Sequence, residues 1–563
     1  MVIFQALTWE ARDIDDEHLV SIFGKTQEGK SVCVTTAFTP YFFVKFPKGA
    51  TQKTAQEIFD VINRKCPECL VSYSVMKAKD VWGFQNNQEF AYMKIDFVNL
   101  AMRRRVDYFL KNAIAISSGM VKLKVYESNL DPVLRLMHRT GIQSTGWLHT
   151  GDQCIRSYLA NVDIDLYCNK WNTLKPVERD DIAPFVVASF DIECNSSTGK
   201  FPNANIIGDA CFQIAVSLCK FGEDEPYEKV CLCYKKTEGA DVISFDTERE
   251  MLEAFQSYVQ KKDIDILTGW NVFGFDFQYI HTRAHLVGCN PNFFKLGKLK
   301  DQVCEISIKK LSSSALGDNT LKLLPMSGRF VFDLFHEVKK GYKLDSYSLN
   351  NVSKLYLGDQ KIDMSPKEMF ARYAEENPKK LGEVAEYCIK DTLLPHRLMK
   401  KLCILLNLLE MAKATWVPLC FLVERGQQIK VFSQLTKKAR ELGFMVPTIR
   451  YGQLPEEPYE GATVLDAQKG AYYTPITALD FEALYPSIMM AHNLCYSSYV
   501  MNEREYGNIP GVTYETFNIG DRTYKFAQDV PSLLPAILFE LKQFRKKAKK
   551  DMAAATGAMK EVY

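Results

Sequence analysis

The sequence lacks any apolar stretch long enough to cross a membrane, because none approaches the ~18 apolar residues that a spanning helix needs. Its first residues, MVIFQALTWEARDIDDE, carry acids where a secretory signal peptide has a basic segment and an apolar core. These absences argue against a membrane protein and against a secreted protein. We therefore expect an intracellular protein with no membrane partner.

An excess of charge of either sign is also missing. The 563 residues hold 70 Lys and Arg against 68 Asp and Glu, so the formal net charge is only +2. The overall charge therefore does not indicate a nucleic-acid partner, and any basic binding surface must be local. The content of 47% hydrophobic and 25% charged residues is ordinary for a folded globular protein and argues against disorder.

The 16 cysteines do not show the paired ligand spacing of a structural zinc site. Cys66 lies close to Cys69, and Cys231 lies close to Cys233, but neither pair has a second pair at zinc spacing. We expect reduced, buried thiols.

The length predicts roughly three to four domains. Residues 1–178 alternate strand-like runs with charged helical stretches and contain no evident catalytic constellation, which is typical of a scaffold or binding domain. The cluster LKPVERDDIAP at 174–184 predicts a boundary. Strand-like and helix-like segments then alternate through 179–403 and predict an α/β domain with a central sheet. The periodicity of residues 404–451 predicts mainly helix.

Two acids end a strongly apolar strand, FVVASFDIEC, at 185–194. Side chains at i and i+2 of a strand point to the same face, so Asp191 and Glu193 are expected to lie together. Bare carboxylates are costly in a core, which leaves a metal or solvent as their partner. The alternative is a strand that has simply reached the surface.

Two further segments carry polar residues among apolar ones. In ILTGWNVFGFDFQYI, Asn271, Phe275 and Asp276 interrupt an aromatic-rich run. In EVAEYCIKDTLLP, a helical pattern puts Tyr387 and Asp391 on one face at i and i+4. A phenol beside a carboxylate can orient a metal-bound water, although a purely structural hydrogen bond explains this pair as well.

A single acid, Asp480, ends an apolar stretch in ALDFEALYPSIMM at 478–490. One carboxylate holds a catalytic Mg²⁺ poorly, because the ion prefers oxygen ligands from one or two carboxylates plus substrate phosphates. If Asp480 is a metal ligand, it therefore needs a partner elsewhere.

Basic residues gather in two places. The segment Lys542–Lys550 holds six of them and no acid, within a stretch that predicts a helix. Arg545 and Lys549 share one face of that helix at i and i+4. The alternative is a solvated charge run. For the run of three arginines at 103–105, we expect a solvated helix face.

Together, Asp191-x-Glu193, Asn271-x3-Phe275-Asp276 and Tyr387-x3-Asp391 resemble the three exonuclease motifs of family B DNA polymerases in order and approximate spacing. Other stretches are similar to delta-type replicative enzymes of that family, and one is similar to polymerases of large DNA viruses. The delta-like stretches are 328–358, 423–435, 459–475 and 479–497, and the virus-like stretch is 126–147. The resemblance covers essentially the whole chain.

The resemblance implies a multidomain α/β fold in which residues 179–403 form an RNase H-like 3′→5′ exonuclease domain beside an N-terminal domain. It also implies two divalent ions, Mg²⁺ or Mn²⁺, in each catalytic site. Asn271 and Phe275 would bind a frayed 3′ nucleotide, with the Phe275 ring stacked on the base.

The resemblance also assigns roles around the exonuclease ions. Asp191 would contact both ions. Glu193 and Asp391 would complete the site that activates water, and Asp276 would support the other ion. Tyr387 would orient the attacking water.

For Asp480, the resemblance implies the role of the first of two palm aspartates that hold the ions for nucleotidyl transfer. Tyr485 would lie under the incoming deoxyribose and exclude a 2′-hydroxyl. Arg545 and Lys549 would bind the triphosphate from the first fingers helix. Ala483 departs from the Ser that the family usually has there, which puts only the local hydrogen bonding in doubt.

The second palm motif, Asp-Thr-Asp, does not occur in the sequence, and neither does the fingers motif Lys-x3-Asn-x2-Tyr-Gly. We therefore expect residues 452–531 to be a partial palm and residues 532–563 the start of the fingers, with 404–451 returning to the N-terminal domain. The chain is expected to be the N-terminal portion of a longer polymerase, from a partial gene or from a gene divided at an intein position.

The expected function is that of a replicative DNA polymerase with a proofreading 3′→5′ exonuclease, working in the nucleus or at a viral replication site. Its partners would be primer–template DNA, deoxynucleoside triphosphates in the full-length enzyme, and a sliding clamp or other processivity factor. A stand-alone exonuclease is one alternative, against which Asp480 and Tyr485 argue. A non-catalytic DNA-binding scaffold is another, and the four exonuclease acids argue against it.

Overall fold

The computed structural model describes residues 1–563 except residues 48, 50, 224, 314–316, 363, 450–462 and 555–563. The chain divides into two compact units that are each discontinuous in sequence. Unit 1 is built from residues 1–38 and 131–433, and unit 2 from residues 39–130 and the described part of 434–563. The finer domain boundaries expected from the sequence stay predictions.

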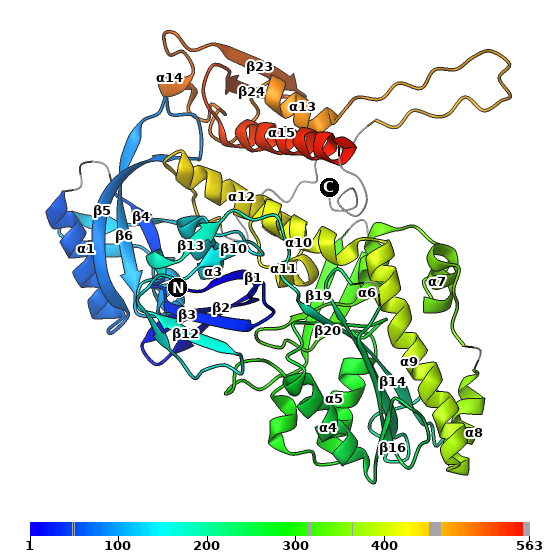
Figure 1. Ribbon diagram of the computed structural model, residues 1–563. Coiled ribbons are helices and arrows are strands. Elements are labelled where there is room, and N and C mark those ends of the chain that lie inside the picture. The colour runs from blue at the N-terminus through cyan, green and yellow to red at the C-terminus, as the bar shows by residue number, and fades with distance from the viewer. Residues whose placement is uncertain are drawn as a thin grey trace. The chain divides into compact units, whose positions relative to one another are not determined.

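Unit 1 contains two large sheets and a hairpin, with helices packed on them (Figure 1). The first sheet has the strand order β11-β12-β3-β2-β1-β10-β13 and the second has the order β17-β16-β15-β14-β18-β21. The strands of the first sheet are β1 (Ile3–Ile14), β2 (Glu17–Lys25), β3 (Ser31–Ala37), β10 (Trp147–His149), β11 (Cys154–Arg156), β12 (Ile164–Cys168) and β13 (Lys175–Val177). Those of the second are β14 (Val186–Cys194), β15 (Cys211–Lys220), β16 (Glu228–Tyr234), β17 (Val242–Phe245), β18 (Ile266–Thr268) and β21 (Phe330–Val331), and the hairpin pairs β19 (Ser307–Ser313) with β20 (Gly317–Leu323).

The helices of unit 1 come mainly after β13. They are α3 (Pro132–Thr140), α4 (Glu248–Lys261), α5 (Asp276–Leu286), α6 (Leu334–Gly341), α7 (Leu349–Leu357), α8 (Pro366–Glu375), α9 (Pro378–Lys401), α10 (Ile404–Thr415) and α11 (Leu419–Glu424), with short 3-10 turns η1 (Trp171–Thr173) and η2 (Pro291–Phe294). The unit boundary falls within α12 (Gln428–Glu441). The helical character expected for 404–451 is thus found in α10, α11 and α12, and the expected α/β class is confirmed.

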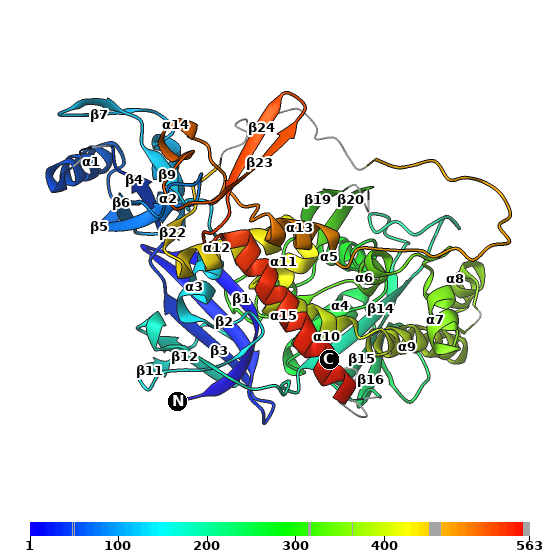
Figure 2. The same ribbon diagram turned by 90° about the horizontal axis from the view of Figure 1, so that it is seen from above.

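The second sheet has helices on both faces, so both faces of its central strands are buried (Figures 1 and 2). Helix α9 packs on β14, β15 and β16, while α4 packs on β15, β16 and β17. Side chains alternate along β14. Phe190 faces α4 and α5, where its ring lies 5.8 Å from that of Phe255 and 5.0 Å from that of Phe277. Asp191 lies opposite Ala215 of β15 in the strand register. Its side chain therefore points to the other face of the sheet, which α9 covers.

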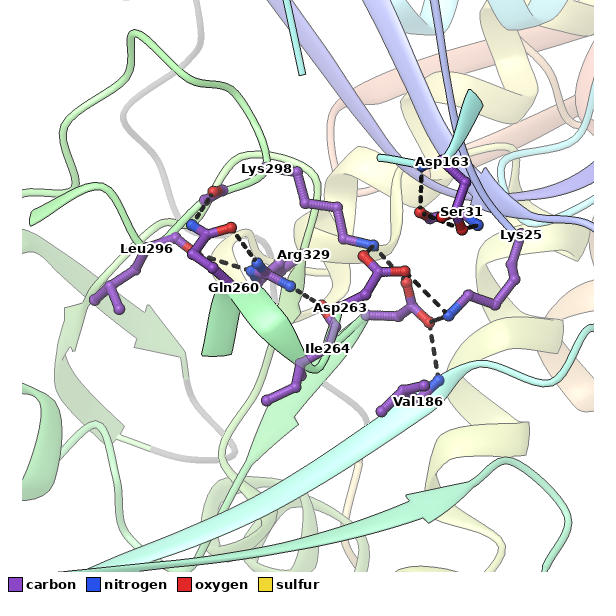
Figure 3. Close-up of polar contacts among 12 residues, drawn as sticks. Lys25, Ser31, Asp163, Val186, Gln260, Asp263, Ile264, Leu296, Lys298 and Arg329 are labelled. Carbon is purple, nitrogen blue, oxygen red and sulfur yellow. Dashed lines mark hydrogen bonds and ion pairs between the residues drawn. The ribbon is translucent and has the colours of Figure 1, made fainter. Parts of the chain in front are cut away.

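A buried group of charges joins the first sheet of unit 1 to the second (Figure 3). The ammonium of Lys25, at the end of β2, lies 2.5 Å from the Asp265 carboxylate, and the ammonium of Lys298 lies 2.6 Å from it. Lys298 also pairs with Asp263 at 2.8 Å. Asp265 accepts the backbone N–H of Val186, the first residue of β14, at 2.8 Å. The strand that carries Asp191 and Glu193 thus begins at this charge cluster.

Unit 2 contains a five-stranded sheet with the order β22-β5-β6-β4-β9 and two small hairpins. Its strands are β4 (Tyr41–Lys45), β5 (Leu70–Asp80), β6 (Glu89–Phe97), β7 (Ile114–Ile116), β8 (Gly119–Val121), β9 (Lys124–Tyr126), β22 (Phe444–Met445), β23 (Tyr514–Ile519) and β24 (Arg522–Ala527). Its helices are α1 (Gln52–Lys65), α2 (Leu100–Phe109), α13 (Leu484–Ala491), α14 (Glu503–Tyr506) and α15 (Leu533–Ala554). Helix α13 packs on α15, the basic helix expected from the sequence.

Two expectations from the sequence are wrong in detail. Cys154 and Cys168 face each other across β11 and β12 and form a disulfide, whereas the other cysteines are free thiols. Arg103 is buried and donates a hydrogen bond to the Leu130 carbonyl at 2.9 Å, so of the three arginines only Arg104 and Arg105 lie on an exposed helix face. Among the described residues, no helix combines the length and the apolar character that a membrane crossing requires.

Candidate active site

Strand β14 supplies two acids to one place. Asp191 and Glu193 lie on the face of the sheet that α9 covers, as the i and i+2 spacing predicts. Their carboxylate oxygens and the sulfur of Cys388 on α9 all lie within 4.8 Å of one another. The Cys388 thiol lies 3.6 Å from the Asp191 carbonyl oxygen, and burial raises the thiol pKa, so this cysteine is a neutral packing group.

Asp276 reaches the site from the first turn of α5, where it is 3% exposed. The turn before it, residues 271–275, is held by Asp333, whose carboxylate accepts the backbone N–H groups of Asn271 at 2.9 Å and of Phe273 at 3.0 Å. Asn271 has φ 66°, a conformation that Asn tolerates better than most residues. Gly269 must lack a side chain, because a Cβ there would lie 2.5 Å from the Phe190 carbonyl oxygen on β14.

Helix α9 contributes Tyr387 and Asp391 on one face, as the helical period predicts. Asp391 is 3% exposed and forms an ion pair with the ammonium of Lys361. The same ammonium lies 3.1 Å from the Tyr387 hydroxyl oxygen. Lys361 comes from the loop between α7 and α8, and its backbone N–H is bound by Asn350 Oδ1 at 3.0 Å.

The acids share an unfavourable electrostatic environment. Burial raises the pKa of Asp191 well above its ordinary range, and the carboxylates of Asp276 and Asp391 raise it further. Burial also raises the pKa of Glu193, with Asp391 as the next cause that raises it. Burial raises the pKa of Asp276 to about 7. Carboxyl groups that are crowded together in a buried place stay protonated unless a cation offsets their charges. The cluster therefore favours the binding of cations.

The same cluster has the donor set of a divalent-cation site. Asp391 Oδ1 is buried and has no hydrogen-bond partner within the described chain, which leaves its lone pairs available. Carboxylate oxygens are preferred ligands of Mg²⁺ and Mn²⁺. The four carboxylates therefore fit such ions: Asp191, Glu193, Asp276 and Asp391. Within the described residues, Lys361 brings a positive charge to the cluster.

An aromatic surface adjoins Asp276. The Phe275 ring is partly exposed and lies 5.0 Å from the ring of Tyr279 and 5.3 Å from that of Phe201. Phe201 is 78% exposed in the segment between β14 and β15. A large exposed ring beside another is suited to stacking on a nucleic-acid base.

The sequence reasoning missed Lys361, Asp333 and Phe201. Gly358 and Pro366 in the sequence predict the end of α7 and the start of α8, and therefore a loop that contains Lys361. Periodicity does not reveal which way a loop side chain points. An exposed Phe in a segment rich in Gly, Asn and Pro, such as Phe201 in 195–210, was the one available signal for a stacking residue.

The second predicted site is not assembled in the described chain. Asp480 lies in residues 463–483, which are exposed and form neither helix nor strand. Within the described residues it belongs to no group of three or more potential metal ligands. Tyr485, in the first turn of α13, is 72% exposed. Arg545 and Lys549 lie exposed on α15, the helix on which α13 packs. Ala483 has φ 51° and precedes α13 without a side-chain cap.

Comparison with known protein families decides the identity. Residues 123–352 match the family model of the DNA polymerase family B exonuclease domain, and residues 417–563 match the model of DNA polymerase family B. The chain belongs to the family B DNA polymerases. The exonuclease and polymerase domains of this family generally use divalent metal ions, in agreement with the carboxylate donor set.

Relatives of this family B chain include viral and cellular enzymes. It is 36% identical to a DNA polymerase of Paramecium bursaria Chlorella virus NY2A, over 97% of this chain and 61% of the viral protein. It is 34% identical to the DNA polymerase delta catalytic subunit of Arabidopsis thaliana, over 96% of this chain and 51% of that protein. The chain thus spans about half the length of its delta-type relatives.

The fold of this family B chain also matches a solved structure. The family B DNA polymerase from the archaeon Pyrobaculum calidifontis superposes with a TM-score of 0.73 at 20% identity, covering 100% of this chain and 66% of the archaeal one. At that identity, the likeness shows the fold alone.

Proposed function

We propose that this chain carries the 3′→5′ proofreading exonuclease of a family B DNA polymerase that acts in DNA replication. The observation that carries the proposal is the convergence of four carboxylates from β14, α5 and α9 around the Lys361 ammonium. Such a cluster is costly to bury without a function that requires cations.

In this proposal Asp191, Glu193, Asp276 and Asp391 hold two Mg²⁺ or Mn²⁺ ions. When bound, two such ions activate an attacking water and stabilise the leaving 3′ oxygen of the scissile phosphodiester. Asp191 lies at the centre of the cluster, since the other carboxylates Asp276, Asp391 and Glu193 all raise its pKa. This central position supports its assignment as a ligand of both ions.

The remaining residues would position water and DNA. Burial raises the pKa of Tyr387, so its hydroxyl stays neutral and can donate a hydrogen bond to one oxygen while it accepts one from another donor. That capacity supports a role in orienting the attacking water beside Asp391. Phe275, together with Phe201, would stack on an unpaired 3′ base, which agrees with a preference for frayed ends, and Asn271 would contact the same nucleotide.

The decisive test is the substitution Asp191→Ala. Loss of the central ligand should lower the release of nucleotides from a 5′-labelled single-stranded oligonucleotide by about 1000-fold in the presence of Mg²⁺. Asp246→Ala, which removes an exposed acid far from this cluster in sequence, is the matched control and should retain the wild-type rate. A wild-type chain that binds Mg²⁺ but releases no 3′ nucleotide would refute the proposal.

We further propose that Asp480 is a palm ligand for nucleotidyl transfer, with Tyr485 as the sugar-excluding residue and Arg545 and Lys549 as triphosphate contacts. The match of residues 417–563 to the polymerase family model supports these roles. DNA and deoxynucleoside triphosphates would be the substrates, and a clamp partner stays a prediction.

Primer extension tests the role of Asp480. Because one carboxylate cannot hold two ions, the purified 563-residue chain should excise 3′ nucleotides but add none to a primer. In an extended chain or complex that supplies a second palm carboxylate, Asp480→Ala should abolish extension and leave excision intact. Extension by the 563-residue chain alone would contradict the two-ligand argument.

A further inference from the structure

A second group of metal-ligating side chains lies on α5, away from the carboxylate cluster. His281 and His285 are four residues apart and therefore share one face of the helix. Glu305 reaches the same point from the segment that precedes β19. One imidazole nitrogen from each histidine and one carboxylate oxygen of Glu305 all lie within 4.8 Å of one another.

The most buried member of this group has an unused nitrogen. His281 is 9% exposed, and its Nε2 forms no hydrogen bond with the residues that the structure describes. This Nε2 lies 3.4 Å from Glu305 Oε2. A cation bound between these two atoms would take both of them as ligands.

The spacing between these two atoms suits a tetrahedral ion. Ligand atoms that lie 2.0–2.1 Å from a Zn²⁺ ion are roughly 3.3 Å from one another in a tetrahedron. The measured 3.4 Å between His281 Nε2 and Glu305 Oε2 is close to that value. His285 and Glu305 are exposed, so small rotations of their side chains can bring the third atom to the same separation.

Aromatic packing explains how the two imidazole rings are oriented, but it gives their nitrogens no binding partner. The His285 ring stacks on Phe294 with centroids 4.3 Å apart, and the His281 ring meets the edge of the Phe294 ring at 5.2 Å. These are contacts between whole rings. They hold both imidazoles beside each other, with centroids 4.8 Å apart, before any ligand binds.

We propose that His281, His285 and Glu305 form a binding site for a divalent transition-metal ion of the zinc type. Two imidazoles and one carboxylate are a donor set that suits Zn²⁺ and leaves a fourth position open to solvent. The all-oxygen cluster around Asp191 suits Mg²⁺ or Mn²⁺ instead. The two sites therefore differ in the ions they select.

The position of the site gives the ion a structural consequence. Helix α5 begins at Asp276, and His281 lies five residues later, a rise of about 7.5 Å along the helix axis. A zinc ion would link α5 to the segment around Glu305. The link would hold α5, the helix that carries Asp276, in place. This structural role does not depend on catalysis at the carboxylate cluster.

The test is zinc binding by the full chain in an excess of Mg²⁺, with Asp191→Ala in every variant so that the carboxylate cluster contributes little. Competition with a chromophoric chelator measures the affinity for Zn²⁺, and the Co²⁺ absorption spectrum reports the coordination. We expect one Zn²⁺ per chain. His285→Gln and Glu305→Gln should each lower the affinity by at least about 10- to 100-fold and change the cobalt spectrum.

Controls make the outcome decisive. Both substituted residues are exposed, so the variants should fold, and circular dichroism checks this. His492→Gln, which changes a histidine 2.9 Å from the Glu515 carboxylate in unit 2, should leave the affinity unchanged. Zinc should also raise the melting temperature of the His492 variant but not that of the His285 variant. Equal zinc affinity and stoichiometry with and without His285 would overturn the proposal.

Discussion

At the residue scale, Lys361 does for the carboxylate cluster what a bound cation does. Burial by itself lowers the pKa of Lys361, but the charges of Asp391 and Asp191 outweigh it and raise the pKa above its ordinary value. The side chain therefore stays charged throughout the physiological range. It offsets part of the repulsion among the acids whenever metal is absent.

The substitution Lys361→Met should consequently destabilise the metal-free protein more than the metal-bound one. Removal of the positive partner leaves Asp391 buried without a counter-ion, which should lower the free energy of unfolding by about 2–3 kcal/mol in EDTA. Urea unfolding in EDTA and in Mg²⁺ measures the difference. Lys390→Met, which removes one of the two basic partners of Asp359 near the surface, is the control and should cost below about 1 kcal/mol in either condition. An equal loss with and without Mg²⁺ would show that Lys361 acts only through packing.

The sequence predicts which acids lie together because regular periods fix the direction of their side chains. The strand period placed Asp191 with Glu193, and the helix period placed Tyr387 with Asp391. Lys361 and Phe201 lie in irregular segments, where direction depends on tertiary contacts such as the bond to Asn350. Asp333 could not be assigned because its role is to bind the backbone of residues 271–273, a contact between distant segments.

At the element scale, α9 combines the face that carries Tyr387 and Asp391 with a buried histidine. Five residues before the end of the helix, His396 lies in the interior and forms a hydrogen bond with the Ser217 carbonyl of β15 at 3.0 Å through Nε2. Burial lowers the pKa of His396 to about 4. The helix that carries Tyr387 and Asp391 thus depends on a histidine that must stay neutral.

This dependence predicts acid sensitivity. Below the unfolded pKa of about 6.5, the unfolded chain protonates His396 and the folded chain does not, so stability falls as the pH decreases from 6.5 towards 4. The contribution lost over that window is about 3 kcal/mol. His396→Gln should flatten the curve of unfolding free energy against pH in this range, whatever its effect at pH 7.5. An unchanged slope would mean that other groups control acid unfolding.

Long-range pairing explains where the sequence failed at this scale. The run FVVASFDIEC predicts β14 because apolar strand formers and turn residues are local signals. The Cys154–Cys168 disulfide depends on the register of β11 and β12, and the burial of Arg103 depends on where the Leu130 carbonyl lies. Neither can be read from local sequence.

At the scale of the whole chain, three buried charges, those of Lys25, Asp265 and Lys298, and the partly buried Asp263 hold the first residues of unit 1 to its second sheet. Burial opposes ionisation of Asp265, but Lys298 and Lys25 outweigh it and lower the carboxyl pKa. The cluster therefore contributes stability above the unfolded pKa of about 3.9 and loses it as the pH falls further.

Asp265→Ala should leave two buried ammonium groups with only the more distant and more exposed Asp263 as a partner, and it should also remove the acceptor for the Val186 N–H. The expected loss is about 3–5 kcal/mol in the free energy of unfolding of unit 1, measured by denaturant titration. Adding Lys25→Met should recover part of this loss, because one unpaired charge is then removed. For comparison, Arg249→Ala at the surface pair with Glu253 should cost below about 1 kcal/mol. A similar small cost for Asp265→Ala would show that the cluster does not hold the two sheets together.

The same charge cluster has a consequence for the order of events during synthesis. Lys25 leaves the ribosome 273 residues before Lys298, since 298 − 25 = 273, which at ~5–20 residues per second is a delay of about 14–55 s. During that delay β1, β2 and β3 exist without the strands and charges that complete unit 1. Residues 42–125, by contrast, contain a complete hydrophobic cluster of their own. We expect this inserted stretch to fold first while the chain is still growing, and the N-terminal strands to be the segment that most needs protection by a chaperone.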